Sequence, residues 1–373
     1  MAQGHHVICC VRDKDRLTIP EEYVIQVRVI EVDFLNQESL SSIPNDIDAA
    51  YYLIHSMSGS AKNYDELEYA SALNFVDRMN LTRVKQVIYL SGIVNDVILS
   101  KHLASRKAVE DVLKTGLFAI TTLRAGIIVG SGSASFEIIR DLVNKLPVMI
   151  TPKWLNTKCQ PIAITDVLAF LIKSLHQPET YDQNFDIGGP DILSYKEMLL
   201  GFAQAAGLKR YIYTVPVMTP KLSSYWLYFV TSTTYKLAAA LVSSMKVEVV
   251  CKDNRINALL GVVPMTYNEA VARALVKIDK DDIVSSWKDA MISGQFTGSV
   301  ANYLKVPKKN CFIDRRKKEI LNRSYTTERI WSIGGETGWY YGDWLWEIRG
   351  FLDKLVGGVG LRRGRTNKHD IHS

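Results

Sequence analysis

Short hydrophobic runs recur along the first half of the chain, separated by stretches with helical periodicity. The clearest unit spans 87–132, where an apolar run at 87–90 precedes a segment, 101–114, with apolar residues at helical spacing. A second apolar run covers 118–129 and ends in a glycine-rich turn. Runs that are apolar on both faces and joined by a helix are typical of buried parallel strands in a βαβ unit.

The same alternation continues on both sides of this unit. Further strands are predicted at 7–11, 24–32, 49–54, 161–164, 184–187 and 208–217. Further helices are predicted at 38–43, 64–79, 136–146, 167–175, from 194 onward, 222–245 and 267–278. Strands that alternate with helices at this spacing predict an α/β fold with a doubly wound parallel sheet.

Two helix starts carry capping signals. Thr165 and Asp166 precede the helix predicted at 167–175, and both residue types favour an N-cap. Ser194 is followed three residues later by Glu197, which is the spacing of a capping box.

A change in composition near 279–282 predicts a domain boundary. We therefore expect a domain at 1–280, with substrate-side helices interleaved after about residue 130, and a smaller α+β domain at 281–373. The second domain contains strand-and-loop sequence at 294–313 and an amphipathic helix at 344–356. Its abrupt end is what a truncated domain would show.

The basic charge of the chain belongs to its last segment. Composition is ordinary for a globular protein, at 47% hydrophobic and 23% charged residues, with a net charge of +6. Residues 305–373 hold 15 Lys and Arg against 8 Asp and Glu. Both a solvated face and peripheral contact with an anionic membrane surface fit this excess. No nucleic-acid partner is expected.

The five cysteines and seven histidines have neither the spacing of a metal site nor that of a disulfide framework. We therefore expect no metal and a reducing, cytoplasmic compartment. The apolar stretch 222–242 is interrupted by Lys236 and by four hydroxyl residues at 231–234. It predicts a buried or interfacial helix pair rather than a membrane span.

Six short motifs together resemble a known family. They are Cys-Val-Arg-Asp (10–13), Val-Asp-Phe (32–34), Tyr-Leu-Ser-Gly (89–92), Leu-Arg-Ala-Gly-Ile-Ile-Val-Gly-Ser-Gly (123–132), Pro-Ile-Ala-Ile-Thr-Asp-Val (161–167) and Phe-Asp-Ile-Gly-Gly-Pro (185–190). Over about 4–274 the chain resembles the extended and atypical short-chain dehydrogenase/reductases, especially the NmrA-like proteins and relatives of the 39-kDa accessory subunit of complex I. Its tail resembles a domain of unknown function, for which the resemblance implies a helix-grip, lipid-binding-like fold.

The resemblance implies a nicotinamide dinucleotide cofactor. Arg12 ends a strand where the adenosine ribose would lie, and a guanidinium there accommodates a 2′-phosphate. This favours NADP, while the neighbouring Asp13 keeps NAD open. The resemblance also places Asp33 near the adenine and His55 and Ser56 at the cofactor crevice. A surface arginine, a turn-forming aspartate and an ordinary loop histidine are the alternatives.

Two further residues, Arg124 and Gly126, are assigned to the cofactor by the same resemblance. They lie in the motif at 123–132. The resemblance gives them this role.

One departure from the family lies at the amino end. The family has a strand, a glycine-rich turn and a helix ahead of the segment that begins here at Gly4, and this turn cradles the pyrophosphate. The strand is the central one of the sheet, so its neighbours would keep unpaired backbone groups, at about 1–3 kcal/mol each. We therefore expect a Rossmann-like sheet lacking its first strand, a fragment or misassigned start, and impaired cofactor binding. A minimal natural variant is the alternative.

The second departure concerns catalysis. In the family a Tyr donates the proton and a Lys four residues later lowers its pKa. Here His102 and Arg106 occupy these places, while Ser91 matches the substrate-orienting Ser. A histidine such as His102 could act as an acid or base near neutral pH, whereas an arginine such as Arg106 is hard to deprotonate. Ser91, His102 and Arg106 are thus the candidate catalytic residues, unless hydride chemistry has been lost.

Three hypotheses on function follow. The first is an NAD(P)(H)-binding protein that acts as a redox sensor or scaffold, with weak or no hydride transfer. The second is an NADP-dependent reductase, epimerase or dehydratase that acts on a hydrophobic small molecule, so whether the chain is an enzyme stays open. The third is a lipid- or quinone-binding protein, peripheral at the inner membrane.

Overall fold

The computed structural model describes residues 4–14, 17, 19–54, 64–95, 101–215, 245–279, 319, 322–333 and 341–355. The strands are β1 (Val7–Val11), β2 (Val27–Glu31), β3 (Ala49–Tyr52), β4 (Gln86–Gly92), β5 (Ala119–Ala125), β6 (Ile128–Val129), β7 (Val148–Pro152), β8 (Lys158–Cys159), β9 (Ile162–Ala163), β10 (Gln183–Ile187), β11 (Leu193–Ser194) and β12 (Tyr211–Val215). The helices are α1 (Gln37–Leu40), α2 (Tyr64–Asn80), α3 (Lys101–Leu113), α4 (Ala134–Lys145), α5 (Ile164–Lys173), α6 (Tyr195–Ala205), α9 (Arg255–Leu260), α10 (Tyr267–Asp279), α13 (Arg323–Trp331) and α14 (Asp343–Leu355).

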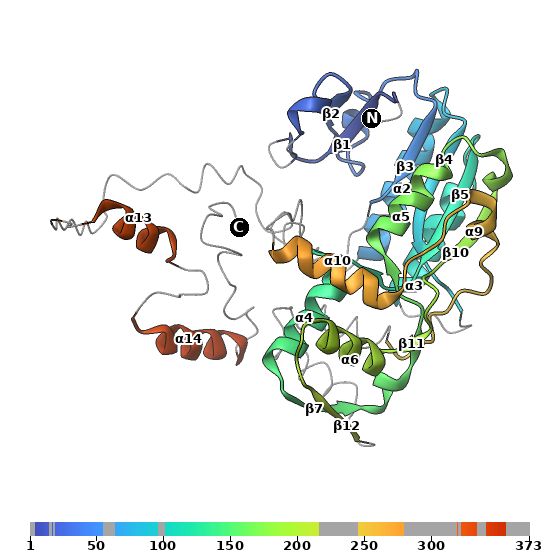
Figure 1. Cartoon of the computed structure of the whole chain (residues 1–373). Helices are drawn as coiled ribbons and strands as arrows, with labels where there is room; N and C mark the ends of the chain where they lie inside the picture. Colours follow the sequence, from blue (N-terminus) through green and yellow to red (C-terminus); the bar gives the residue numbers. More distant parts are fainter. Residues whose placement is uncertain are drawn as a thin grey trace.

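A four-stranded parallel sheet with the order β10-β5-β4-β3 forms the centre of the fold (Figure 1). Its strands are apolar on both faces because helices cover both. Val87 and Tyr89 of β4 pack in one core with residues of α2 and α3. Ile88 of the same strand packs on the other side, against residues of α5 and α9. The predicted α/β fold with a parallel, doubly wound sheet is confirmed.

The first two strands form a separate parallel pair, β1-β2. They share one hydrophobic core with the larger sheet, because Ile8 and Ile30 pack in the same cluster as Tyr52 of β3. In Figure 1, β1 lies between β2 and β3, but β1 and β3 belong to different hydrogen-bonded sheets. The parallel sheet is therefore divided between β1 and β3, where a doubly wound sheet has its first strand.

A buried carboxamide joins the amino end of this sheet to the end of α5. The Gln86 side chain is fully buried; its Nε2 donates to the Thr121 hydroxyl (2.9 Å) and to the Ser174 carbonyl (2.8 Å). Its Oε1 accepts the backbone N–H of His176 at 2.7 Å. His176 has φ +56°, a left-handed conformation in which a turn ends the helix.

A second hydrophobic core lies beyond the sheet. It is built from one face of α4, α6 and α10, with residues such as Phe136, Phe202 and Val271 fully or almost fully buried. The short parallel pair β7-β12 borders the same region (Figure 1). Helices are thus present after residue 130, as predicted, and their place on the substrate side stays a prediction.

The two capping predictions have different outcomes. The Ser194 capping box is confirmed, because its hydroxyl accepts the Glu197 N–H while the Glu197 carboxylate accepts the Ser194 N–H at 2.6 Å. The cap at Thr165 and Asp166 is wrong: α5 already begins at Ile164, and Ala163 is its N-cap. The Asp166 carboxylate instead accepts the backbone N–H of Met265, a partner far away in the sequence.

Several predicted boundaries also change. The strand predicted at 24–32 begins only at Val27, because a short 3-10 helix (Glu21–Tyr23) and a turn precede it. The run at 118–129 is two strands, since β6 leaves the main sheet and pairs with β9. The helix predicted at 38–43 ends at Leu40.

The tail is described only in part. Its two described helices, α13 and α14, lie apart from the sheet in Figure 1. The segments predicted at 222–242 and 294–313 fall outside the described residues, and the boundary near 280 stays a prediction. No helix in the described ranges has the length and apolar character needed to cross a membrane.

Candidate functional site

Ser91 and Arg124 meet at the carboxyl ends of β4 and β5. The two residues are directly opposite in the parallel register, so their side chains leave the same face of the sheet. That face is covered by α3, and Ser91 is buried, with 5% of its surface exposed. The structure thus brings together two residues that the sequence assigned to catalysis and to the cofactor.

Arg106 reaches the same edge from α3. Its Nη1 donates to the Leu90 carbonyl at 2.8 Å, and its own carbonyl accepts the Tyr89 hydroxyl at 3.3 Å. Burial raises the pKa of Tyr89, and the positive charge of Arg106 opposes that rise. Arg106 therefore holds the end of β4 against α3, through its guanidinium and its backbone carbonyl.

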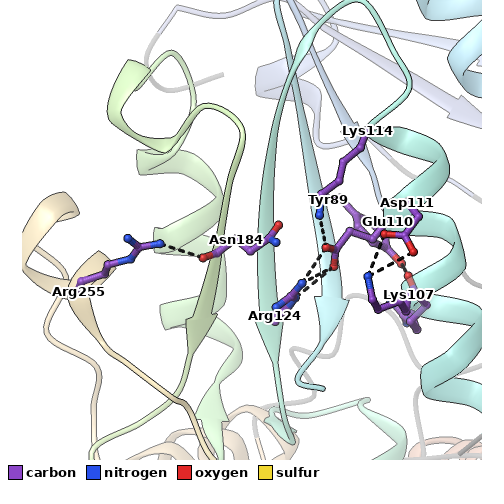
Figure 2. Close-up of polar contacts among 9 residues, drawn as sticks. Tyr89, Lys107, Glu110, Asp111, Lys114, Arg124, Asn184 and Arg255 are labelled. Atoms are coloured by element: carbon purple, nitrogen blue, oxygen red, sulfur yellow. Dashed lines mark hydrogen bonds and ion pairs between the residues drawn. The ribbon is translucent and has the colours of Figure 1, made fainter. Parts of the chain in front are cut away.

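A buried carboxylate fixes Arg124. Glu110 of α3, 1% exposed, accepts three hydrogen bonds from the Arg124 fork: Nε donates to Oε2 at 3.1 Å, and Nη2 donates to Oε1 at 2.7 Å and to Oε2 at 2.9 Å. Lys114 approaches the same carboxylate from the other side, with 2.6 Å between Nζ and Oε1 (Figure 2). We call Glu110, Arg124 and Lys114 the Glu110 cluster.

The charge balance of the Glu110 cluster favours the ionised acid. Burial alone would raise the pKa of Glu110, but the hydrogen bonds and positive charges of Arg124 and Lys114 outweigh it and hold this pKa below its usual value. The bidentate pair also fixes the direction of the Arg124 guanidinium. The cofactor role of Arg124 stays a prediction, and in this structure its fork faces Glu110.

Gly126 lies where two segments approach closely. A Cβ added there would be 3.0 Å from Cγ1 of Val249 and 3.4 Å from the Gln160 carbonyl. The glycine thus lets the chain after β5 pack against the segments at 160 and 249. Its role toward a cofactor also stays a prediction.

Arg12 and Asp33 lie at one edge of the smaller sheet. Val11 pairs with Glu31, so the residues that follow β1 and β2 emerge together at the carboxyl ends of these strands. Arg12 is exposed there. The Asp33 carboxylate accepts the Leu35 N–H at 3.0 Å and thereby forms the turn ahead of α1.

The remaining candidates are described less fully. The backbone of His102 lies in the first turn of α3, one helical turn before Arg106, but the described part does not include its side chain. His55 and Ser56 fall outside the described residues.

Two buried acids in this region were not among the sequence candidates. Glu110 is one, and Glu68 of α2, 3% exposed, is the other; it accepts a hydrogen bond from Ser105 of α3. Both lie on helix faces that pack on the sheet. A carboxylate at an apolar helical position was the available signal, since buried charges need partners.

A cavity of about 820 Å³ lies beside the carboxyl end of β10. Its lining includes Gln160, Gly188, Cys251, Asn254 and Asn257, and none of the candidate site residues. Burial raises the pKa of the Cys251 thiol to about 12, so this thiol stays protonated at neutral pH. The cavity thus lies at the same carboxyl edge of the parallel sheet as Ser91, but other residues line it.

Two family matches cover the ends of the chain. Residues 1–139 match the NAD(P)H-binding family, and residues 307–373 match a family described as protein of unknown function (DUF2867). No curated protein matches the chain. The first match covers all the described residues from Gly4 to the early part of α4, and thus includes β1 to β5.

Solved structures show the same fold across both cores. A nucleoside-diphosphate-sugar epimerase from Staphylococcus aureus is 16% identical, with a TM-score of 0.56 over 71% of this chain and 90% of that chain. Triphenylmethane reductase from Citrobacter sp., solved with NADP(H), is 15% identical, with a TM-score of 0.56 over 72% and 90%. The enzyme WbmG from Bordetella bronchiseptica, solved with NAD and UDP, is 15% identical. Its TM-score is 0.55 over 76% of this chain and 90% of that chain.

These matches define the class of the fold. It is a Rossmann-type α/β fold, shared with these epimerase and reductase structures, and residues 307–373 match the family of unknown function. The family match supports binding of a nicotinamide dinucleotide.

The residues present fit one end of such a cofactor. The exposed Arg12 guanidinium at the carboxyl end of β1 suits a ribose phosphate, and Asp33 beside it closes a turn at the same edge. Ser91 lies at the carboxyl end of β4, and Arg106 bonds the Leu90 carbonyl beside it; the role of both residues toward a nicotinamide stays a prediction.

Proposed function

We propose that this protein binds NADP(H) at the carboxyl edge of its parallel strands and has weak or no hydride-transfer activity. The observation that carries the proposal is Arg106. The family's lysine is replaced by Arg106, whose guanidinium bonds the backbone of β4, and the family's tyrosine is replaced by His102. A redox-sensing or scaffold role fits a cofactor site without this proton relay.

Titration of the full chain with NADPH and NADH, followed by the nicotinamide fluorescence, tests the cofactor part. Arg12→Ala should weaken NADPH binding about tenfold, the loss of one charge-assisted contact with the 2′-phosphate, and leave NADH binding unchanged. Arg28→Ala is the matched control. Arg28 is also exposed on the smaller sheet, but it lies near the amino end of β2, whereas Arg12 lies at the carboxyl edge. Absence of saturable binding of either dinucleotide would overturn the proposal.

A variant that restores the family's Tyr and Lys tests whether their replacement accounts for weak or absent hydride transfer. The double variant His102→Tyr with Arg106→Lys recreates the family's pair, and we expect NADPH oxidation with a panel of sugar nucleotides and aromatic ketones to exceed that of the unaltered chain. Turnover by the unaltered chain that is lost in His102→Phe would instead support the alternative, an NADP-dependent reductase, epimerase or dehydratase acting on a hydrophobic small molecule.

One observation favours a second candidate, contact with a lipid surface. Helix α14 exposes Trp344 (60%), Phe351 (57%) and Leu352 (55%), and the tail that carries it holds the chain's basic excess. Sedimentation with vesicles of anionic and of neutral lipids tests it. Trp344→Ser should reduce binding to the anionic vesicles, and equal recovery of both proteins in the supernatant would exclude this role.

A further inference from the structure

The cavity at the carboxyl end of β10 lies between two segments that side-chain hydrogen bonds hold together. Gln160 Nε2 donates to the Gly189 carbonyl at 2.7 Å, and Gln160 Oε1 accepts the Cys251 N–H at 3.0 Å. The Asp186 carboxylate, in β10, accepts the Lys252 N–H at 2.9 Å. The walls are therefore fixed before any ligand arrives, and a ligand need not order them.

Helix α9 forms one wall of this cavity and lies beside β10 (Figure 1). Ile256 and Leu260 of α9 pack in one core with Ile88 of β4. Because successive residues of a strand point to opposite faces, Ile88 and Ser91 leave β4 on different sides. The α9 wall thus belongs to the other face of the sheet from Ser91, and a ligand against it would contact none of the candidate site residues.

The lining is mainly apolar and has no excess of charge. The cavity volume of about 820 Å³ is within the range usual for small-molecule sites. Its only charged residues are Lys252 and Asp253, which are exposed and of opposite sign. The apolar lining residues are Pro190, Ile192, Ala258, Val262, Val263 and Pro264. This composition favours an uncharged, largely apolar ligand over a phosphate.

Two carboxamides line the cavity and are not used by the fold. Asn254 and Asn257 are three residues apart and so lie on the same side of α9. Asn254 is the N-cap of α9, yet its side chain does not bond the helix, and Asp253 accepts the Arg255 N–H at 3.2 Å. In the described part of the chain neither carboxamide has a hydrogen-bond partner. Each offers both donors and an acceptor, which matches a ligand group that also presents both.

We propose that this cavity binds an uncharged, mainly apolar small molecule that carries an amide or lactam group. The apolar part of the ligand lies against Val262 and Pro264, and its amide group exchanges hydrogen bonds with Asn254 and Asn257. The site is distinct from the edge proposed for NADP(H) and does not depend on cofactor binding.

Three small probes test the class of ligand, by saturation-transfer NMR with the full chain. Acetanilide, an aromatic amide, should bind with a dissociation constant of about 1 mM. Acetophenone keeps the ring and the carbonyl but lacks the N–H, and should bind about fivefold more weakly through the loss of one hydrogen bond. Phenylacetate should not bind measurably, because its charge would lose hydration beside the apolar lining. Equal binding of acetanilide and either other probe, or no saturable binding of acetanilide, would overturn the proposal.

Two variants locate the probe. The double variant Asn254→Leu with Asn257→Leu removes both carboxamides at nearly constant size, so acetanilide should bind no more tightly than acetophenone. Ala258→Trp changes an exposed lining residue and fills the cavity, so binding of both probes should be lost. Asn144→Leu is the matched control, because Asn144 is exposed on α4 and does not line the cavity. An unchanged preference for acetanilide in the double variant, or unchanged binding in Ala258→Trp, would overturn the proposal.

Competition with the cofactor separates this site from the proposed function. Saturating NADPH should not displace acetanilide, and Arg12→Ala should bind acetanilide as the unaltered chain does. Displacement by NADPH would place the probe in the dinucleotide site and overturn the proposal. Acetanilide binding in a chain that binds no dinucleotide would support this site and contradict only the proposed function.

Discussion

The strand pairs β1-β2 and β4-β5 are both parallel and rich in apolar residues, but they differ in burial. Both contain the apolar runs expected for buried strands, yet only β4 and β5 are mostly buried. Helices and neighbouring strands enclose β4 and β5, whereas β1 lacks a partner on one side among the described residues. Burial therefore depends on the neighbours of a strand as much as on its own composition.

Truncation of one isoleucine in each pair should give the largest contrast. Ile88→Ala, in β4, removes a fully buried side chain and is expected to lower the free energy of unfolding by about 2–5 kcal/mol. Ile8→Ala, at the half-buried position in β1, should cost about 1 kcal/mol because less apolar area returns to water. Urea unfolding of the full chain measures both, and equal losses would contradict the contrast.

Disruption of the Glu110 cluster should give the next largest loss in the free energy of unfolding. This cluster joins α3 to β5, and the described residues show no such cluster on β1. Glu110→Gln leaves Arg124, 20% exposed, without its anion, so we expect a loss of about 2 kcal/mol, below the range for a fully buried pair. Asp111→Asn is the matched control: its ion pair with Lys107 on the same helix is exposed and should contribute at most about 0.5 kcal/mol. Figure 2 shows both pairs. Equal effects of the two variants would show that burial of Glu110 does not matter.

The pH dependence of the free energy of unfolding should be the smallest of these effects. Because the pKa of Glu110 is lowered in the folded state, its contribution to stability is fully present above its unfolded pKa, near 4.5, and is lost as the pH falls through the folded value. The difference in unfolding free energy between the unaltered chain and Glu110→Gln should therefore narrow between pH 6 and pH 3. A constant difference across this range would mean that another group controls it.

The sequence allowed prediction of the sheet and of one helix cap. Strand positions follow from local apolar runs, and the Ser194 capping box from two residues three apart, so both depend on short-range information. Asp166 shows the limit, because its carboxylate bonds the backbone of Met265, almost a hundred residues later. The kink that separates β5 from β6 likewise depends on pairing with β9.

The sequence assigned roles to Ser91, Arg106 and Arg124 by resemblance, and these roles stay predictions. The structure shows that the three residues lie together at the carboxyl ends of β4 and β5. The partners of the two arginines were not foreseen. Glu110 occupies an apolar helical position, and only the three-dimensional packing of α3 on β5 shows that Arg124 neutralises it.

The Gln86 carboxamide has a consequence for motion. One side chain holds β5 through Thr121 and the last turn of α5 through Ser174 and His176, so the amino ends of the central strands and the helix above them are tied as a single rigid base. Opening or closing of the fold around a ligand must then pivot about that base, and its amplitude will be greatest at the far ends of the strands.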